Sequence, residues 1–293
     1  AFMWPETVED PNIDFNLVSR SGPQGRTLVE NAFFEELKKD HVPVDHYAAF
    51  RREGALGSVI DAITTQAVCH TIRKHKPNLI AVHLVDTDHE QHSHGSGHYL
   101  SKAALTNVDH QIGQIIKATK DAGIYDDTVF IIGADHGFTS VYDEINLRPF
   151  FAEAGLADKV RFYEGGWAPF LRLLPEFNKA QDQPKLDAIF ARLMKNLHVI
   201  RIVESKDFPS VIGLPRYEDS DRVRGQYLIV GDSETYFVWT QDNDTSRRKR
   251  RRPAHGHGYL PFHPKMYPML VLSGPGIKKG AMIGHVHNAD IAP

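Results

Sequence analysis

Three short apolar runs constrain the fold more than any other feature of this 293-residue chain, at residues 79–85, 128–134 and 269–272. Continuous hydrophobicity over so few residues is typical of parallel strands that are buried on both faces of an α/β sheet. Between the first two runs, residues 99–122 carry apolar side chains at helical spacing, and Gly123 follows as a stop signal. The pattern predicts a strand–helix–strand unit, and hence an α/β fold with a mostly parallel central sheet flanked by helices.

Two further helices are expected near residues 28–39 and 59–76. The segment 143–250 differs in character, since several prolines interrupt it and residues 226–239 are typical of a hairpin with Gly231-Asp232 at its turn. We therefore predict a smaller α+β insertion.

The predicted insertion divides the rest of the chain, so that residues 1–142 and 251–293 together form the main domain. At the end of the insertion, residues 247–252 are six consecutive basic residues, which are expected to form a mobile, solvated loop. The chain begins at Ala1 without an initiator Met or a signal sequence, and we expect it to be a fragment at both ends.

Composition excludes several classes of protein. The formal net charge of −3 shows no basic excess, so no nucleic-acid polymer is expected as a partner. No apolar run approaches the ~20 residues that a membrane-spanning helix needs. The lone cysteine, Cys69, cannot form an internal disulfide and indicates no redox compartment.

The 17 histidines are unevenly distributed, and their clustering suggests metal binding. Five of them fall within sixteen residues that begin inside the first apolar run, and a second group precedes the last run: His83, His89, His92, His94 and His98, then His255, His257 and His263. In open α/β sheets ligands gather at the carboxyl ends of strands, where the first cluster is expected.

Asp88 and His92 are four residues apart, so on a helical turn they would lie on one face and could share an ion. After the second run, Asp135-His136-Gly137 directs a carboxylate and an imidazole toward one point, while glycine lets the backbone turn away. The alternatives are a solvated polar loop for the first motif and turn chemistry with a satisfied histidine for the second.

The third motif is His255-Gly256-His257-Gly258-Tyr259, which lies shortly before the last apolar run. Its glycines allow a histidine to approach a distant loop closely. A flexible hinge with bystander histidines is the alternative interpretation of this motif alone.

Together the three motifs resemble the alkaline phosphatase superfamily, in its type I phosphodiesterase/nucleotide pyrophosphatase branch. The resemblance rests on order and spacing over roughly residues 79–140 and 254–293, and its matching residues are Asp88, His92, Gly95, Asp135, His136, Gly137, His257, Gly258, Tyr259, Met266, the turn Gly274-Pro275-Gly276 and the closing Asp290-Ile291-Ala292-Pro293. Trp4-Pro5 is similar to a segment that shortly follows the nucleophile in relatives. The resemblance implies an alkaline-phosphatase-like fold.

The resemblance also implies two zinc ions. Asp88, His92 and His257 would hold one, and Asp135 and His136 would hold the other with an upstream Asp and a Thr or Ser nucleophile that this chain does not include. Asp86 is expected to orient a ligand histidine from the second coordination shell.

One departure leaves the ligand set open. Gln91 stands where the family usually has glycine, so His89 or His94 could replace His92.

The expected activity is zinc-dependent hydrolysis of phosphodiester or pyrophosphate bonds in a small phosphate ester, such as a nucleotide or a lipid head group. A phosphomonoesterase or phosphonate hydrolase of the same superfamily is the alternative within the enzymes. A non-catalytic metal-binding module is the alternative of another class. Relatives of this kind are often secreted or periplasmic.

Overall fold

The computed structural model describes most of the chain, namely residues 13–17, 19–22, 25–28, 31–46, 57–163, 166–196, 198–221, 223–232, 234–242, 248–287 and 290–291. Trp4-Pro5, Arg247 and Ala292-Pro293 lie outside these residues. Among the described helices, none combines the length and the apolar character required to cross a bilayer.

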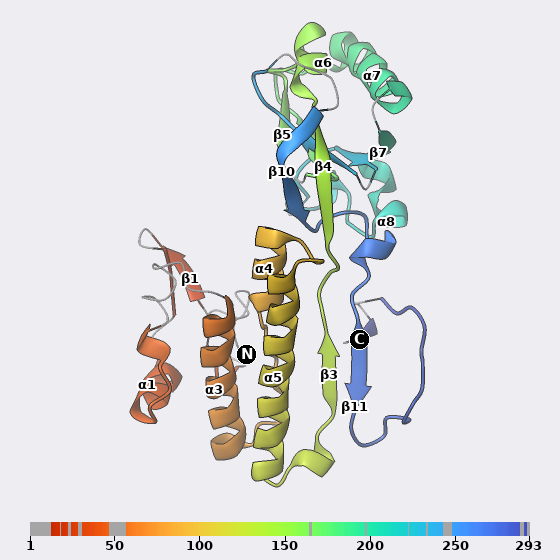
Figure 1. Ribbon diagram of the computed structural model, residues 1–293. Coiled ribbons are helices and arrows are strands. Elements are labelled where there is room, and N and C mark those ends of the chain that lie inside the picture. The colour runs from red at the N-terminus through yellow and green to blue at the C-terminus, as the bar shows by residue number, and fades with distance from the viewer. Residues whose placement is uncertain are drawn as a thin grey trace. The chain divides into compact units, whose positions relative to one another are not determined.

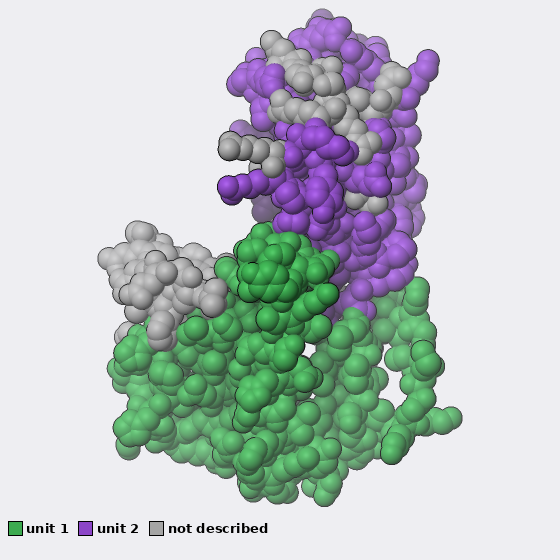
Figure 2. Space-filling model, viewed as in Figure 1, with its two compact units in different colours: residues 1–133, 269–293 green, residues 134–268 purple. Residues whose placement is uncertain are grey.

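The chain forms two compact units, coloured separately in Figure 2. Unit 1 comprises residues 1–133 and 269–293, and unit 2 comprises residues 134–268. The division into a main domain and an insertion at residues 143–250 stays a prediction, because compactness does not tell which segment is inserted into which.

Unit 1 contains the three helices that the sequence predicts, α1 (Ala32–Lys39), α3 (Gly57–His75) and α5 (Tyr99–Asp121), and one further helix, α4 (Asp86–His94). Apolar side chains of α1 and α3 share one buried core, which includes Phe34, Leu37 and Ile72. Asn31 caps α1 by accepting a hydrogen bond from the backbone N–H of Phe34. After α5, Gly123 takes a left-handed conformation with φ of +69°, as a helix stop requires.

The strands of unit 1 form two small antiparallel pairs, β1 (Ser19–Gly22) with β2 (Gly25–Leu28) and β3 (Phe130–Gly133) with β11 (Leu270–Ser273) (Figure 1). The antiparallel pairing of β3 with β11 corrects the parallel pairing that their apolar runs suggested. The run at residues 79–85 contributes an isolated bridge at Val82 and no longer strand. An apolar run does not tell whether a strand is buried on both faces or partly exposed, and Ile131 of β3 and Val271 of β11 are in fact about half exposed.

Unit 2 is an α+β assembly with two sheets, ordered β10-β4-β9 and β5-β6-β8-β7. Its strands and helices are β4 (Thr139–Asn146), α6 (Arg148–Glu153), β5 (Val160–Tyr163), β6 (Phe170–Leu173), α7 (Lys179–Asn196), β7 (Val199–Glu204), α8 (Phe208–Val211), β8 (Tyr227–Gly231), β9 (Thr235–Val238) and β10 (Arg248–Gly256). Short 3₁₀ helices complete both units: η2 (Val44–His46), η3 (Tyr125–Asp127), η4 (Ser205–Asp207), η5 (Tyr217–Asp219) and η6 (Pro264–Met266).

Two expectations for unit 2 are wrong. Strands β8 and β9 form where the hairpin was expected, but β8 pairs with β6 and β7, while β9 pairs parallel to β4. The basic run is not a loop from Arg248 onward, because it begins β10 and pairs antiparallel with β4. There Arg250 lies 2.6 Å from Glu144 and stacks over the ring of Tyr236, so tertiary partners give a highly charged segment strand geometry.

Candidate metal centre

In unit 1, helix α4 brings Asp88 and His92 together, as their spacing predicts. The two residues lie one helical turn apart, and His92 Nε2 is 3.4 Å from Asp88 Oδ1. Both side chains are a little under half exposed, although the Asp88 Oδ1 atom that faces His92 is itself buried. Asp88 and His92 therefore form a preformed carboxylate–imidazole pair.

A buried carboxylate on α3 positions the start of α4. Asp61 accepts hydrogen bonds from the backbone N–H groups of Val85 (2.7 Å) and Asp86 (3.0 Å). Burial raises the pKa of Asp61 to about 6. Gly57 permits this approach of the two helices, because a Cβ atom there would lie 2.7 Å from the Cα of Asp86. Asp61 was not predicted from the sequence, and its signal is that it is the one acidic residue of α3.

Asp86 lies almost wholly inside unit 1 and is held by α5. Its carboxylate accepts a hydrogen bond from Asn107 Nδ2 at 3.0 Å, and burial raises the pKa of this carboxyl. That contact joins α4 to α5 directly behind Asp88. A role for Asp86 in orienting a ligand histidine stays a prediction.

The alternative ligands on α4 have other surroundings. His94 lies 3.5 Å from Glu90, one turn before it, and its ring stacks on His98 at a centroid distance of 4.7 Å. His89 lies one residue beyond Asp88 on the helix, so its side chain points about 100° away from that carboxylate. These placements favour His92 as the partner of Asp88.

In unit 2, the Asp-His-Gly motif is fixed by a backbone interaction that requires glycine. The N–H groups of Gly137 and Phe138 donate to the carbonyl oxygens of Met266 (2.8 Å) and Lys265 (2.9 Å). A Cβ atom on Gly137 would lie 2.0 Å from the Lys265 oxygen, which no ordinary contact allows. Hence Gly137 packs directly against the backbone around Met266, and this contact fixes the position of the motif.

The two histidines predicted to face different ions lie side by side in unit 2. The rings of His136 and His257 stack with a centroid distance of 3.5 Å and an interplanar angle of 12°. His136 Nδ1 lies 3.0 Å from the Gly137 carbonyl oxygen, so Nδ1–H donates there and Nε2 keeps its lone pair for a ligand. Asp135 Oδ2 is 3.5 Å from that Nε2.

The His-Gly-Tyr motif is anchored on both sides of His257. Before it, His255 at the end of β10 shares a 2.7 Å hydrogen bond with the Ser140 hydroxyl of β4. After it, Gly258 has φ of +87°, and the buried Tyr259 donates its hydroxyl hydrogen to the Gly231 carbonyl. His257 is therefore held between two fixed points, rather than carried by a flexible hinge.

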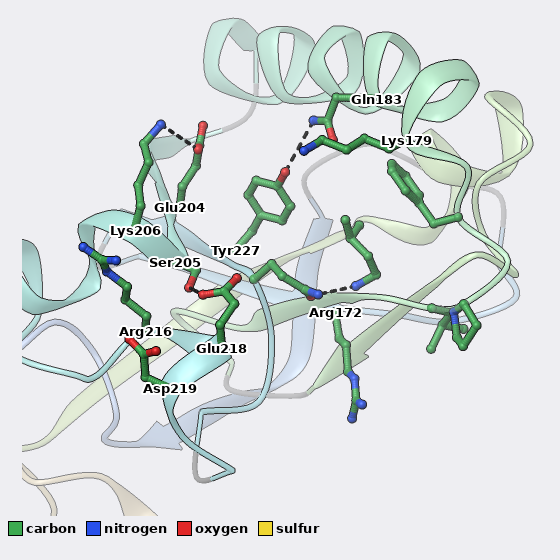
Figure 3. Close-up of a pocket in the computed structure, with 15 residues that line it drawn as sticks. Arg172, Lys179, Gln183, Glu204, Ser205, Lys206, Arg216, Glu218, Asp219 and Tyr227 are labelled. Atoms are coloured by element: carbon green, nitrogen blue, oxygen red, sulfur yellow. Dashed lines mark hydrogen bonds and ion pairs between the residues drawn. The ribbon is translucent and has the colours of Figure 1, made fainter.

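Unit 2 also contains an open cavity of about 790 Å³, shown in Figure 3, which none of the predicted ligands lines. Four cationic side chains reach its wall: Arg172, Lys179, Lys206 and Arg216. Acidic groups balance them, with Lys206 Nζ 2.9 Å from Glu204 and a 2.6 Å hydrogen bond from Ser205 to Glu218. This cavity is lined by both cationic and acidic side chains and by no histidine, so it lacks the imidazole and carboxylate ligands of the predicted centre.

The predicted ligands therefore divide between the units, with Asp88 and His92 in unit 1 and Asp135, His136 and His257 in unit 2. Each subset is ordered by its own unit's contacts. Their convergence on a pair of ions stays a prediction.

The sequence pattern of one family matches residues 1–260, and that family is described as type I phosphodiesterase / nucleotide pyrophosphatase. Among curated proteins, the chain is similar to the Bos taurus bis(5'-adenosyl)-triphosphatase ENPP4, with 26% identity over 66% of this chain and 37% of that protein. It is also similar to human ectonucleotide pyrophosphatase/phosphodiesterase family member 5, with 22% identity over 74% of this chain and 41% of that protein. The chain thus spans about two fifths of the length of these relatives.

Solved structures show the same fold. Murine ectonucleotide pyrophosphatase / phosphodiesterase 5 superposes with a TM-score of 0.57 and 19% identity, over 75% of this chain and 54% of that one. An inactive variant of it in complex with AMP superposes equally well. Phosphonoacetate hydrolase from Sinorhizobium meliloti, in complex with phosphonoformate, gives a TM-score of 0.53 and 15% identity, over 76% of this chain and 52% of that one. The fold is alkaline-phosphatase-like, as predicted.

Proposed function

This chain belongs to the type I phosphodiesterase / nucleotide pyrophosphatase family, and we propose that it carries the metal ligands of a zinc-dependent hydrolase. Its substrates would be small phosphodiesters or pyrophosphates, with the Thr or Ser nucleophile supplied from upstream of this chain. The curated relative ENPP4 is a bis(5'-adenosyl)-triphosphatase, and the murine relative has been solved with AMP. These names support a nucleotide as the substrate class.

The observation that carries the proposal is the pair of preformed ligand subsets. Asp88 with His92, and the stacked His136 and His257 beside Asp135, supply two carboxylates and three imidazoles. This donor set fits zinc, which favours imidazole nitrogen and carboxylate oxygen and keeps an open position in catalytic sites. Asp88, His92 and His257 would hold one ion, and Asp135 and His136 would contribute to the other.

Bound zinc ions would activate the hydroxyl nucleophile and stabilise charge on the phosphoryl oxygens. The chain's own residues prepare for this. Two aspartates offset positive charge at the centre, and the Nδ1–H bond of His136 fixes which ring nitrogen is available as a ligand. Rigid placement of the ligands by Gly137 reduces the reorganisation needed when a substrate binds.

Activity and zinc content of the full-length protein test this proposal together. Asp88→Asn and His257→Gln should each lower kcat/KM for a nitrophenyl nucleotide diester by at least about 100-fold and reduce bound zinc, since each removes a proposed ligand. His94→Gln is the matched control on α4, because His94 faces Glu90 rather than Asp88, and it should retain both activity and zinc.

Two results would refute the proposal. The first is wild-type activity in Asp88→Asn or His257→Gln. The second is a wild-type protein that binds zinc but turns over no phosphate ester, which would identify a non-catalytic metal-binding module. Parallel assays with nitrophenyl phosphate and with a phosphonate distinguish the diesterase from the alternative activities of the superfamily.

A further inference from the structure

Unit 1 contains a second cluster of metal-ligating side chains, formed by Glu36 of α1 and by His70 and His75 of α3. The Nε2 atoms of the two histidines lie 2.8 Å and 2.6 Å from the same oxygen, Glu36 Oε1. One ligand atom from each residue falls within 4.8 Å of the other two. None of these residues belongs to the predicted catalytic ligands.

Packing places these side chains before any ion is present. Phe33, Phe34 and Leu37 of α1 join the core formed by α3, which turns the Glu36 carboxylate toward His70 and His75. The His75 ring lies on the Phe15 ring at a centroid distance of 4.4 Å. The three groups are also only partly exposed, with side-chain exposures of 13%, 24% and 26% for His70, His75 and Glu36. The cluster is therefore ordered rather than a chance meeting of surface side chains.

The positively charged side chain of Lys74 competes with a cation for Glu36. Hydrogen bonds from His70 and His75 lower the pKa of Glu36 to about 2, so the carboxylate is anionic at neutral pH. Lys74 Nζ lies 3.3 Å from Glu36 Oε1, but it is closer to Asp40, at 2.8 Å. The lysine can keep its Asp40 partner while the histidines and Glu36 bind a cation.

We propose that Glu36, His70 and His75 form a binding site for a divalent cation of the zinc class, distinct from the catalytic centre. Two imidazole nitrogens and one carboxylate oxygen are a zinc-type ligand set with one position left for water. Tetrahedral zinc with bonds of about 2.0 Å places its ligand atoms about 3.3 Å apart. The distances from Glu36 Oε1 to the two Nε2 atoms, now 2.8 Å and 2.6 Å, would thus increase by only about 0.6 Å, which side-chain rotation can provide.

The site is accessible to an ion. A cleft of about 700 Å³ in unit 1 is lined by His70, Lys74 and Asp40 on the side of the cluster. A bound ion would join α1 to the last turn of α3 in addition to their shared apolar core. The ion would stabilise the fold, because a ligand that binds only the folded state raises the melting temperature.

Cobalt titration tests the site, since Co²⁺ bound in a zinc-type site shows visible d–d absorption that counts and characterises each site. The protein is stripped of metal and titrated as the wild type and as His70→Gln/His75→Gln. The double variant should bind one equivalent fewer and lose at least about 100-fold in affinity at that site. His110→Gln, on the exposed side of α5, is the control and should match the wild type.

Lys74→Met supplies a test that does not depend on weakening the fold. Removing the competing positive charge should tighten cobalt binding about fivefold, the equivalent of one Coulomb contact near 4 Å in water. An Asp88→Asn/His257→Gln background should retain this equivalent, so loss of the catalytic proposal would leave the site standing. Equal metal content and affinity in the wild type and His70→Gln/His75→Gln would overturn the proposal and leave an interhelical hydrogen-bond network. Unchanged affinity in Lys74→Met would overturn the assigned geometry.

Discussion

Replacing Gly137 by alanine should disrupt the half of the candidate centre that lies in unit 2. The new Cβ atom would lie 2.0 Å from the carbonyl oxygen of Lys265 and 2.8 Å from the carbonyl carbons of Lys265 and Met266. All three are backbone atoms, so no side-chain rotation can relieve the clash. The segment around Met266 must move by more than about 1 Å to reach ordinary contact distances.

The cost follows from the contacts that this movement breaks. Two backbone hydrogen bonds, Gly137 N–H to Met266 O and Phe138 N–H to Lys265 O, contribute about 0.5–1.5 kcal/mol each. Overpacking at a fixed position costs a further 1–3 kcal/mol or so. We expect the free energy of unfolding of unit 2 to fall by about 2–6 kcal/mol, with loss of metal at the centre.

Urea unfolding followed by tryptophan fluorescence measures this change, because Trp167 and Trp239 both lie in unit 2. Gly113→Ala is the matched control: the residue is exposed in α5 and no atom lies within 4 Å of a Cβ placed there. Alanine should stabilise that helix by about 0.5–1 kcal/mol. The reasoning fails if Gly137→Ala unfolds within about 0.5 kcal/mol of the wild type, the range of ordinary surface substitutions.

Two further predictions address the supports of the fold. Burial raises the pKa of Asp61 from 3.8 to about 6 in the folded state, which therefore binds this proton more tightly than the unfolded state. The contribution of Asp61 to the free energy of unfolding should thus decrease by up to about 3 kcal/mol as pH rises from about 4 to about 6. In thermal unfolding across this pH range, Asp61→Asn should remove the decrease, and an unchanged pH dependence would contradict the assignment. Arg250→Ala should lower the free energy of unfolding by about 1–2 kcal/mol, since it removes the ion pair with Glu144 and the stacking over Tyr236. Arg252→Ala, at an exposed position of the same strand, should be neutral, and equal effects of the two arginine substitutions would indicate that the run is held by something other than these contacts.

The features that the sequence predicts correctly are those that neighbouring residues determine. The spacing of Asp88 and His92 requires only a helical turn, and α4 provides it. Helix α5 and its stop at Gly123 follow equally from local periodicity and from backbone freedom at glycine. The glycine of the Asp-His-Gly motif differs from these, because the contact that requires it comes from Lys265 and Met266, far away in the chain.

Features that depend on distant partners were predicted less well. The turn residues Gly231-Asp232 were correctly seen as a break between strands, but which sheets β8 and β9 join depends on β4 and β6, far away in the chain. Charge alone made residues 248–252 look like a solvated loop, because their acidic partners on β4 lie about a hundred residues earlier. The apolar residues at 79–85 predict a strand, but in the structure this segment forms only an isolated bridge at Val82.

The Glu36 cluster shows why a metal site can escape sequence patterns altogether. His70 and His75 are five residues apart, a spacing that places side chains about 140° apart around a helix and matches no same-face pair. Glu36 comes from another helix, 34 residues before His70, and reaches both rings because the apolar side chains of α1 pack on α3. The convergence is thus a product of helix packing rather than of any motif. A search for metal ligands at i and i+4, which finds the pair Asp88 and His92, does not find this cluster.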